Sequence, residues 1–328
     1  MVGRKIDEIK LSSVIQGLLR CPACLSALQR KKEYLECNKN SCLGRYPIFR
    51  GVPLLIDEEK SLFKVDDVQQ GRNSFLGLAR EKKYMRFLKA VAPTISKNIK
   101  GKKNFRKLVD ILLKKNKNPR VLIIGGRVLG QGMGPLFRYS CIEIVESDVS
   151  LGPRTKIVCD SHSLPFQAGS FDAVIVQAVL EHVVDPSQCV EEIHRVLGKE
   201  GLVYGESPFM AQVHGGSLDF TRFTHLGHRR LFRKFEEIDS GAVCGPGMAL
   251  AWSYEYFLLS FVRSRMARLF VQGFARCTSF FLKYFDYLLI DMPGSLDAAS
   301  GYYFLGRKSE KVLSDRELVK LYRGGRRS

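Results

Sequence analysis

A series of short apolar segments in the middle of the chain constrains its fold more than any other feature. These segments are rich in β-branched residues and lie at 120–124, 141–145, 157–160 and 171–176. The last is apolar almost throughout, as expected of a strand buried on both faces of a parallel sheet. A helical pattern at 190–197 and another strand at 202–204 follow. Strands that alternate with helices predict an α/β fold with a doubly wound sheet.

Glycines and acidic residues follow these predicted strands. Gly125 and Gly126 end the first strand, with Gly130 soon after. Such a turn lets the backbone approach a nucleotide-like ligand. Asp148 and Asp160 follow the second and third strands, where a carboxylate can accept hydrogen bonds from a ribose or a base. The pattern predicts a cofactor site at the carboxyl ends of the strands.

The same region resembles class I S-adenosylmethionine-dependent methyltransferases of the type 11 kind. Four stretches in the family's order carry the resemblance, which covers about residues 118–240: Asp160–Phe166, Ser170–Val174, Val179–Pro186 and Glu192–Leu197. It implies a Rossmann-like fold and S-adenosyl-L-methionine as cofactor, with Asp148 on the ribose and Asp160 at the adenine. The cofactor residues that it implies are Gly125, Gly126, Gly130, Asp148, Asp160, Ser161 and Glu181.

Two other classes share part of this pattern. A nicotinamide dehydrogenase has the glycine turn and the acidic residue, but it does not require the Leu-Pro-Phe and Leu-Glu-His stretches. A non-catalytic methyltransferase-fold scaffold that binds RNA is the second. It is suggested by Ile123, which stands where the family usually has an acidic residue, and by Arg127 in the glycine loop. We favour an active methyltransferase.

Four of the nine cysteines form two close pairs near the N-terminus. Cys21 and Cys24 are separated by two residues, and Cys37 and Cys42 by four. This spacing is typical of a structural zinc site with four thiolate ligands, which would stabilise a module too small to have a sufficient core. The surrounding residues, about 11–57, resemble the zinc-ribbon-like activator domain of tRNA and protein methyltransferases. That resemblance implies a module that supports a methyltransferase.

Polar residues after the fifth strand are the candidates for catalysis. We expect His182 or His214 to act as the base and Asp219 and Arg222 to bind or orient the acceptor. A structural ion pair between Asp219 and Arg222, with the histidines in hydrogen-bonding niches, is the alternative.

The acceptor is less constrained by the sequence. Similar proteins with the Asp219–Thr224 stretch and the 299–308 stretch are typically bacterial enzymes suspected in glycan or lipid assembly. We therefore expect a lipid-linked, saccharide or other small-molecule acceptor. A tRNA or a translation protein is the alternative, which the zinc module and the basic residues favour.

The charge distribution suggests an anionic partner. The net charge is +19, and residues 81–120 hold 14 Lys and Arg against 2 Asp and Glu. Residues 252–290 are rich in aromatic residues interrupted by arginines, which is typical of a helix pair that contacts an anionic membrane surface. A helical lid over the catalytic domain fits the same composition, and RNA would satisfy the same basic residues. Because no signal core or spanning segment is evident, we expect a cytoplasmic protein, at most peripheral at the inner face of a membrane.

These observations divide the chain into three parts. We expect a zinc-ribbon-like module at 1–60, a basic helical connector at 61–117 and a methyltransferase domain at 118–328 with a helical insertion at about 250–292. The sequence does not indicate an oligomeric state.

Overall fold

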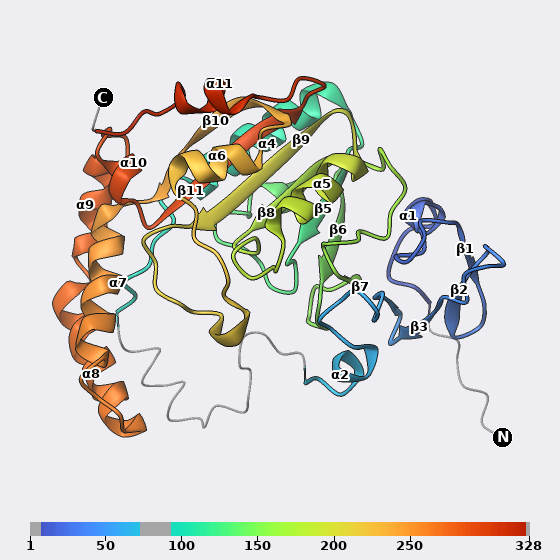
Figure 1. Cartoon of the computed structure of the whole chain (residues 1–328), viewed down its shortest axis with the longest axis horizontal. Helices are drawn as coiled ribbons and strands as arrows, with labels where there is room; N and C mark the ends of the chain where they lie inside the picture. The colour runs from blue at the N-terminus through green and yellow to red at the C-terminus, as the bar shows by residue number, and fades with distance from the viewer. Residues whose placement is uncertain (1–7, 73–92, 326–328) are drawn as a thin grey trace.

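The computed structural model describes residues 8–72 and 93–325, and these form an α/β protein around one large sheet (Figure 1). The strand order is β1-β2-β3-β4-β7-β6-β5-β8-β9-β11-β10. Neighbouring strands from β4 to β9 in this order are parallel, whereas β11 is antiparallel to both β9 and β10. The strands are β1 (Leu28–Arg30), β2 (Tyr34–Cys37), β3 (Arg45–Phe49), β4 (Val52–Leu55), β5 (Arg120–Ile124), β6 (Glu143–Asp148), β7 (Ile157–Cys159), β8 (Phe171–Gln177), β9 (Leu197–Pro208), β10 (Phe235–Cys244) and β11 (Gly301–Lys308).

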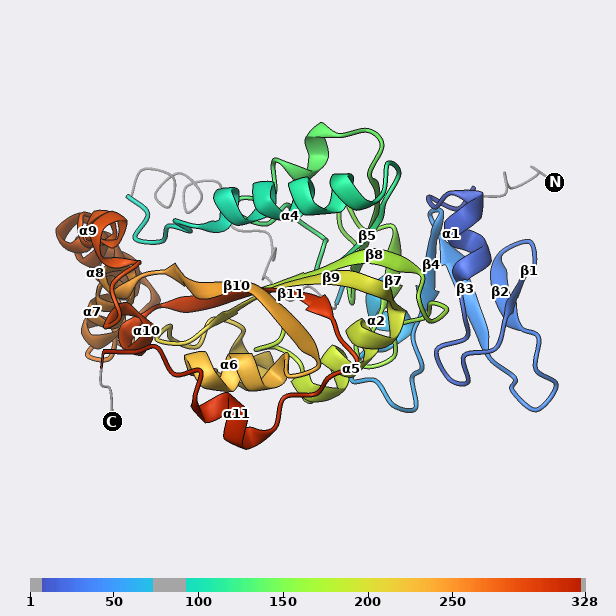
Figure 2. The same cartoon turned by 90° about the horizontal axis from the view of Figure 1, so that it is seen from above.

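Helices cover both faces of the sheet, which confirms the predicted doubly wound architecture. Helix α4 lies on one face, and α5 and α6 lie on the other (Figure 2). The helices are α1 (Ser13–Leu18), α2 (Val65–Gln69), α4 (Gly101–Lys115), η1 (Leu136–Arg138), α5 (Pro186–Val196), η2 (Gly216–Leu218), α6 (His225–Leu231), α7 (Pro246–Leu259), α8 (Arg265–Ser279), α9 (Leu282–Leu289), α10 (Ser295–Ala298) and α11 (Asp315–Val319).

The apolar pattern of the sequence explains how these layers pack. The strands expected between residues 120 and 176 are all present as β5, β6, β7 and β8. Strands β5 and β8 are buried on both faces, which explains their nearly continuous apolar sequences. Helix α4 buries Phe105, Leu108 and Leu112 against one face of the sheet. Helix α5 begins at Pro186, four residues before the expected start, because the Asp185 side chain accepts a hydrogen bond from the Gln188 N–H and caps the helix.

The N-terminal part shares the central sheet and its core. Strand β4 pairs in parallel with β7, with Leu54 opposite Val158. Leu19 also forms an isolated bridge with Phe166, and both side chains are buried in one apolar cluster. A strand of the predicted 1–60 module is therefore an integral strand of the central sheet.

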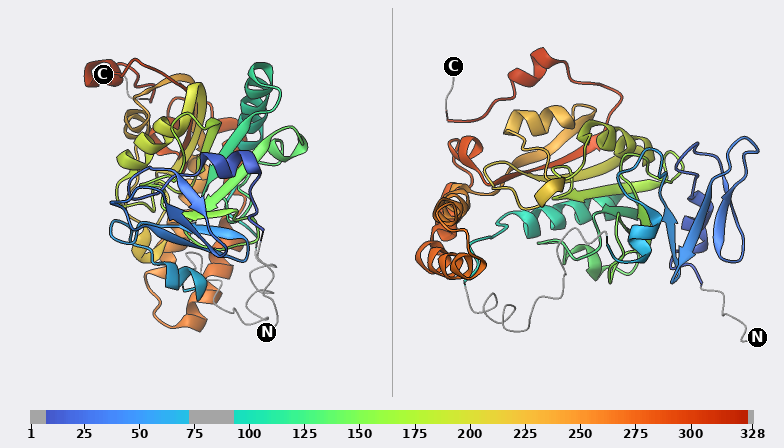
Figure 3. Two further views of the ribbon diagram at one scale, coloured as in Figure 1. Left: turned by 90° about the vertical axis from the view of Figure 1, so that its right-hand side faces the viewer. Right: turned by 60° about the horizontal axis from the view of Figure 1, so that its bottom comes forward.

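The helices of the C-terminal insertion lie at the opposite end of the molecule from the N-terminal part (Figure 3). The region where a helix pair was expected contains three helices, α7, α8 and α9. A break at Phe280 and Phe281 separates α8 from α9. Arg276 donates to the buried Glu255 carboxylate at 3.0 Å and joins α8 to α7. Among the described residues, no helix combines the length and the apolar character needed to cross a membrane.

Residues 73–92, within the predicted basic connector at 61–117, lie outside the described residues. Helix α4, in the rest of that range, packs on the sheet through the apolar face described above.

The pairing of β4 with β7 predicts that the N-terminal part and the central sheet unfold together. Leu54→Ala removes a fully buried side chain, so we expect the free energy of unfolding to fall by about 2–5 kcal/mol. Urea denaturation should show one transition. Leu43→Ala is the control, because Leu43 is 92% exposed and should change stability by less than about 0.5 kcal/mol. Two separate transitions in wild type would contradict this prediction.

Candidate active site

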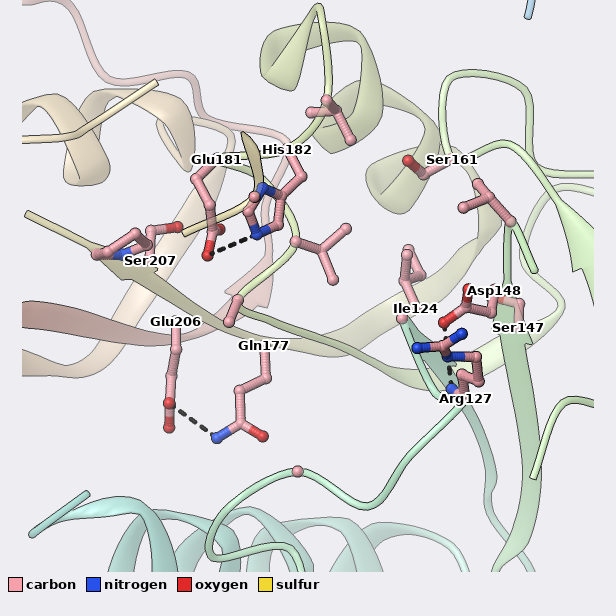
Figure 4. A pocket seen from close by; sticks show the side chains of 18 of the residues that line it. Ile124, Arg127, Ser147, Asp148, Ser161, Gln177, Glu181, His182, Glu206 and Ser207 are labelled. Atoms are coloured by element: carbon pink, nitrogen blue, oxygen red, sulfur yellow. Dashed lines mark hydrogen bonds and ion pairs between the residues drawn. The ribbon is translucent and has the colours of Figure 1, made fainter. Parts of the chain in front are cut away.

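A cavity of about 960 Å³ lies at the carboxyl ends of the parallel strands (Figure 4). The chain passes from β5 outward to β6 and β7, and then returns to β8 on the other side of β5. Open α/β sheets bind ligands at such a reversal, because the loops on its two sides diverge. The volume is near the upper end of the usual range for ligand sites, about 300–1,000 Å³. It leaves room for a cofactor and a second small molecule.

The glycine turn lies beside this cavity, and Gly125 lines it whereas Gly126 does not. Gly125 follows β5 with φ +75°, and a Cβ there would overlap the side chain of Val179. A Cβ on Gly126 would lie 2.8 Å from Cβ of Glu146, and its N–H donates to Ser147 O at 2.8 Å. Glycine is therefore required at both positions by the close approach of the backbone. Gly130 also lines the cavity.

Asp148 lies on the cavity wall at the end of β6. Its Oδ1 accepts hydrogen bonds from N and Oγ of Ser150 at 3.0 and 2.9 Å, and its Oδ2 accepts one from N of Arg127 at 3.2 Å. Burial raises the pKa of Asp148 above its ordinary value. The Arg127 side chain, which sequence analysis did not count as a site residue, is 5% exposed and lines the same part of the cavity.

Asp160 lies at the end of β7, with Ser161 beside it on the cavity wall. Its Oδ1 accepts from Nδ1 of His162 at 2.6 Å, and its Oδ2 accepts from Ser61 Oγ at 2.5 Å. Although burial raises the pKa of Asp160, these hydrogen bonds outweigh it and hold that pKa below its usual value. Ser61 belongs to the segment after β4, so the N-terminal part contributes directly to this end of the cavity. Sequence reasoning missed Ser61.

Glu181, His182 and His214 meet at the other end of the cavity. Glu181 and His182 lie in the turn after β8, and His214 lies in the loop after β9. Nε2 of each histidine is 3.8 Å from Glu181 Oε1. The structure therefore brings together both predicted base candidates and a carboxylate assigned to the cofactor.

Asp219 and Arg222 do not line the cavity, in contrast to the expected contact with an acceptor. Asp219 Oδ2 accepts from the backbone N–H of His214 at 2.8 Å and of Gly215 at 3.0 Å, and Arg222 pairs with the same carboxylate. Although burial raises the pKa of Asp219, these donors hold it well below its usual range. Because both charged groups are used within the loop, their contacts position His214.

Glu206 is a buried cavity residue that sequence reasoning missed. Its carboxylate accepts hydrogen bonds from Tyr204 Oη at 2.5 Å, Gln177 Nε2 at 2.8 Å and Asn98 Nδ2 at 3.0 Å. Burial raises the pKa of Glu206 above its ordinary value. The available signal was an acidic residue two positions after the apolar run Leu202–Tyr204, at the carboxyl end of a predicted strand.

The four N-terminal cysteines meet outside this cavity. Cys21 Sγ is 3.8 Å from Cys42 Sγ, and Cys24 Sγ is 3.5 Å from Cys37 Sγ. All four sulfurs lie within 4.8 Å of one another. Four thiolates at about 2.3 Å from one tetrahedral ion would be separated by about 3.8 Å, so this set fits zinc. The backbone N–H of Lys39 donates to Cys37 Sγ at 3.4 Å, a contact that favours a thiolate.

Comparison with known proteins finds a methyltransferase domain in part of the chain. Residues 134–205 match the family model described as "Methyltransferase domain". A curated relative from Streptomyces fradiae, described as an uncharacterized 37.1 kDa protein in transposon TN4556, is 38% identical over 86 residues. This match covers 25% of our chain and 23% of the relative, so the chain spans about a quarter of that relative's length.

Solved structures align with part of the chain at low identity. A phosphoethanolamine N-methyltransferase 2 from Haemonchus contortus is 15% identical with a TM-score of 0.42, over 72% of our chain and 60% of that chain. The cyclase SpnF is 19% identical with a TM-score of 0.37, over 62% of our chain and 81% of that chain.

The α/β sheet with a cavity at its reversal is the architecture of class I methyltransferases, and residues 134–205, which match the methyltransferase domain model, contribute to both. Within that class, the match is to the type 11 methyltransferase domain. The matched residues include Asp148, Asp160 and Glu181, which lie at the two ends of the cavity.

Proposed function

We propose that this protein transfers the methyl group of S-adenosylmethionine to a lipid-linked, saccharide or other small acceptor. The observation that carries this proposal is that one continuous cavity has two chemically different ends. Asp148 and Asp160 lie at a nucleoside-type end, and Glu181, His182 and His214 lie at the other. Methyl transfer requires the acceptor atom to lie behind the methyl group, in line with the sulfur that leaves. A cavity with two chemically different ends supports that arrangement.

At the nucleoside-type end, two carboxylates face a sugar and a base. Asp148 accepts hydrogen bonds from backbone and Ser150, and its remaining acceptor capacity suits ribose hydroxyls. Asp160, fixed by Ser61 and His162, suits the amino group of the adenine. Gly125 and Gly130 line the part of the cavity where the methionine part of the cofactor would lie.

Calorimetry with S-adenosylhomocysteine tests the cofactor proposal. Asp148→Ala removes a charge-assisted acceptor worth about 1.5–3 kcal/mol, so we expect about tenfold to hundredfold weaker binding than in wild type. Asp110→Ala is the control, because Asp110 is an exposed acid on α4 outside the cavity, and it should bind like wild type. Absence of binding to the folded wild-type protein would contradict the proposal and favour a non-catalytic scaffold.

Helix α7 supports a lipid-linked acceptor. Met248 and Trp252 of this helix line the cavity, whereas Phe257 at its end is 62% exposed. Further exposed apolar side chains continue over α8 and α9: Phe261, Met266, Phe270, Phe274, Phe281, Tyr284, Phe285 and Leu288. Exposed arginines 263, 265 and 268 lie among them in the sequence. We propose that these helices contact an anionic membrane surface and bring its lipids to the cavity.

Vesicle sedimentation tests this membrane contact. The double change Phe257→Ser and Phe261→Ser removes two exposed aromatic groups whose insertion stabilises binding, so we expect at least tenfold weaker binding to anionic vesicles. The double change Val312→Ser and Val319→Ser is the control, because these valines are exposed outside the three helices. Undiminished sedimentation of the folded aromatic variant would remove the membrane proposal. Strong wild-type binding to tRNA instead would favour the nucleic-acid alternative.

We also propose that Cys21, Cys24, Cys37 and Cys42 hold a structural zinc ion. Elemental analysis should find zinc at this site in wild type, and Cys42→Ser should lose it and lower stability, because metal binding energy is also folding energy. Cys141→Ser is the matched control, since Cys141 is an exposed free cysteine away from the cluster. A fully stable wild-type protein that is free of metal under reducing conditions would exclude structural zinc.

A further inference from the structure

Three electron-pair donors converge at the acceptor end of the cavity. One carboxylate oxygen of Glu181 and one ring nitrogen each of His182 and His214 all lie within 4.8 Å of one another. Both Nε2 atoms are 3.8 Å from Glu181 Oε1, which is beyond hydrogen-bond distance. The two rings stand nearly perpendicular, at 81°, with their centroids 5.0 Å apart. Figure 4 shows Glu181 and His182 directed toward each other in the cavity.

The carboxylate of Glu181 lacks hydrogen-bond donors of its own. Its side chain is fully buried, and both oxygens lack a hydrogen-bond partner among the described residues. A buried carboxylate without such a partner is costly unless a cation lies close to it. This group therefore points to a positively charged ligand.

The histidines are oriented as ligands of a cation. His182 Nδ1 is 2.7 Å from the carbonyl oxygen of Leu218, and His214 Nδ1 is 3.2 Å from that of Gln212. A carbonyl can only accept, so Nδ1 is the donor in both contacts, and Nε2, which faces Glu181, is the ring nitrogen that can bind a cation. Metal-binding histidines usually show this second hydrogen bond, which fixes the ring and its tautomer. Arg222 lies farther from His214 Nδ1, at 3.5 Å.

The loop that carries His214 is fixed to the turn that carries the other two groups. The backbone N–H groups of Phe220 and Thr221 donate to Glu181 O at 2.8 and 3.2 Å. Gly215 allows the loop to approach the His182 ring, since a Cβ there would lie 2.5 Å from it. The three groups are thus held together before any ligand binds.

We propose that Glu181, His182 and His214 bind a first-row divalent transition metal ion. Two imidazole nitrogens and one carboxylate suit such ions and leave coordination positions open on the cavity side. Ligand bonds of about 2.1 Å would bring the three atoms to about 3.0–3.4 Å from one another, a shift of less than 1 Å from the 3.8 Å contacts.

The open positions suit an oxygen of the acceptor. A divalent ion there would bind a hydroxyl group and favour loss of its proton to water, which prepares an oxygen nucleophile. This assignment of the acceptor as a hydroxyl rests on the proposed methyl transfer, whereas the metal site itself does not.

Metal titration of the full-length protein tests the site, and any metal bound by the four cysteines is left in place. We expect one equivalent of Mn²⁺ to bind, as measured by electron paramagnetic resonance and calorimetry. Zn²⁺ and Co²⁺ should compete with Mn²⁺ for this site. Mn²⁺ is the preferred probe because thiolates disfavour it. Glu181→Gln and His214→Ala should each weaken binding at least a hundredfold. Glu206→Gln is the matched control, because Glu206 is a buried cavity carboxylate outside the trio, and it should bind Mn²⁺ like wild type.

His214→Ala keeps the test independent of folding, since the His214 side chain is one third exposed in a loop. Folding of each variant is checked by circular dichroism and urea denaturation, because Glu181 is also a predicted cofactor residue. Wild-type protein that binds S-adenosylhomocysteine but none of the three ions would overturn the metal site and leave the methyltransferase proposal intact. Ion binding that is equal in wild type, Glu181→Gln and His214→Ala would overturn it as well. Binding of the ion without binding of S-adenosylhomocysteine would support the metal site and contradict the proposed function.

Discussion

Parallel pairing of β5 with both β6 and β8 is the constraint on which the rest of the structure depends. Residues Val121–Ile124 hydrogen-bond to strands on either side, so they must be apolar on both faces and fully paired. The chain leaves β5 in one direction and returns on the other side. The loops after β5 and β8 therefore diverge, and the cavity lies between them. The proposed contacts of Asp148, Asp160 and Glu181 with the cofactor lie at the carboxyl ends of the parallel strands or in the loops that follow them.

The acceptor end shows how charged groups can act without touching a substrate. Asp219 and Arg222 satisfy one another and the backbone of the 211–222 loop, and this loop presents His214 to Glu181. A buried ion pair of this kind contributes little net stability, because desolvation offsets its attraction. The ion pair instead fixes the conformation of the 211–222 loop, which has little apolar core of its own.

The sequence predicted the features that depend on local pattern. Buried parallel strands leave continuous apolar runs, and site residues at strand ends follow directly, so β5 to β8 and the cavity positions of Asp148 and Asp160 agree with the structure. Contacts between distant segments leave no such pattern. Ser61 meets Asp160 across 99 residues, and β4 pairs with a strand about a hundred residues later. The number of insertion helices was also wrong, because their apolar residues continue through the break at Phe280.

The hydrogen bond from Ser61 to Asp160 couples the N-terminal part to the cavity. Strand β4 and the segment after it connect the cysteine module to the nucleoside-type end of the cavity. A ligand that binds better when this segment is ordered must, by reciprocity, stabilise the ordered segment to the same extent. On the two proposed assignments, zinc at the cysteines and a nucleoside at Asp160 would therefore each raise the affinity of the protein for the other.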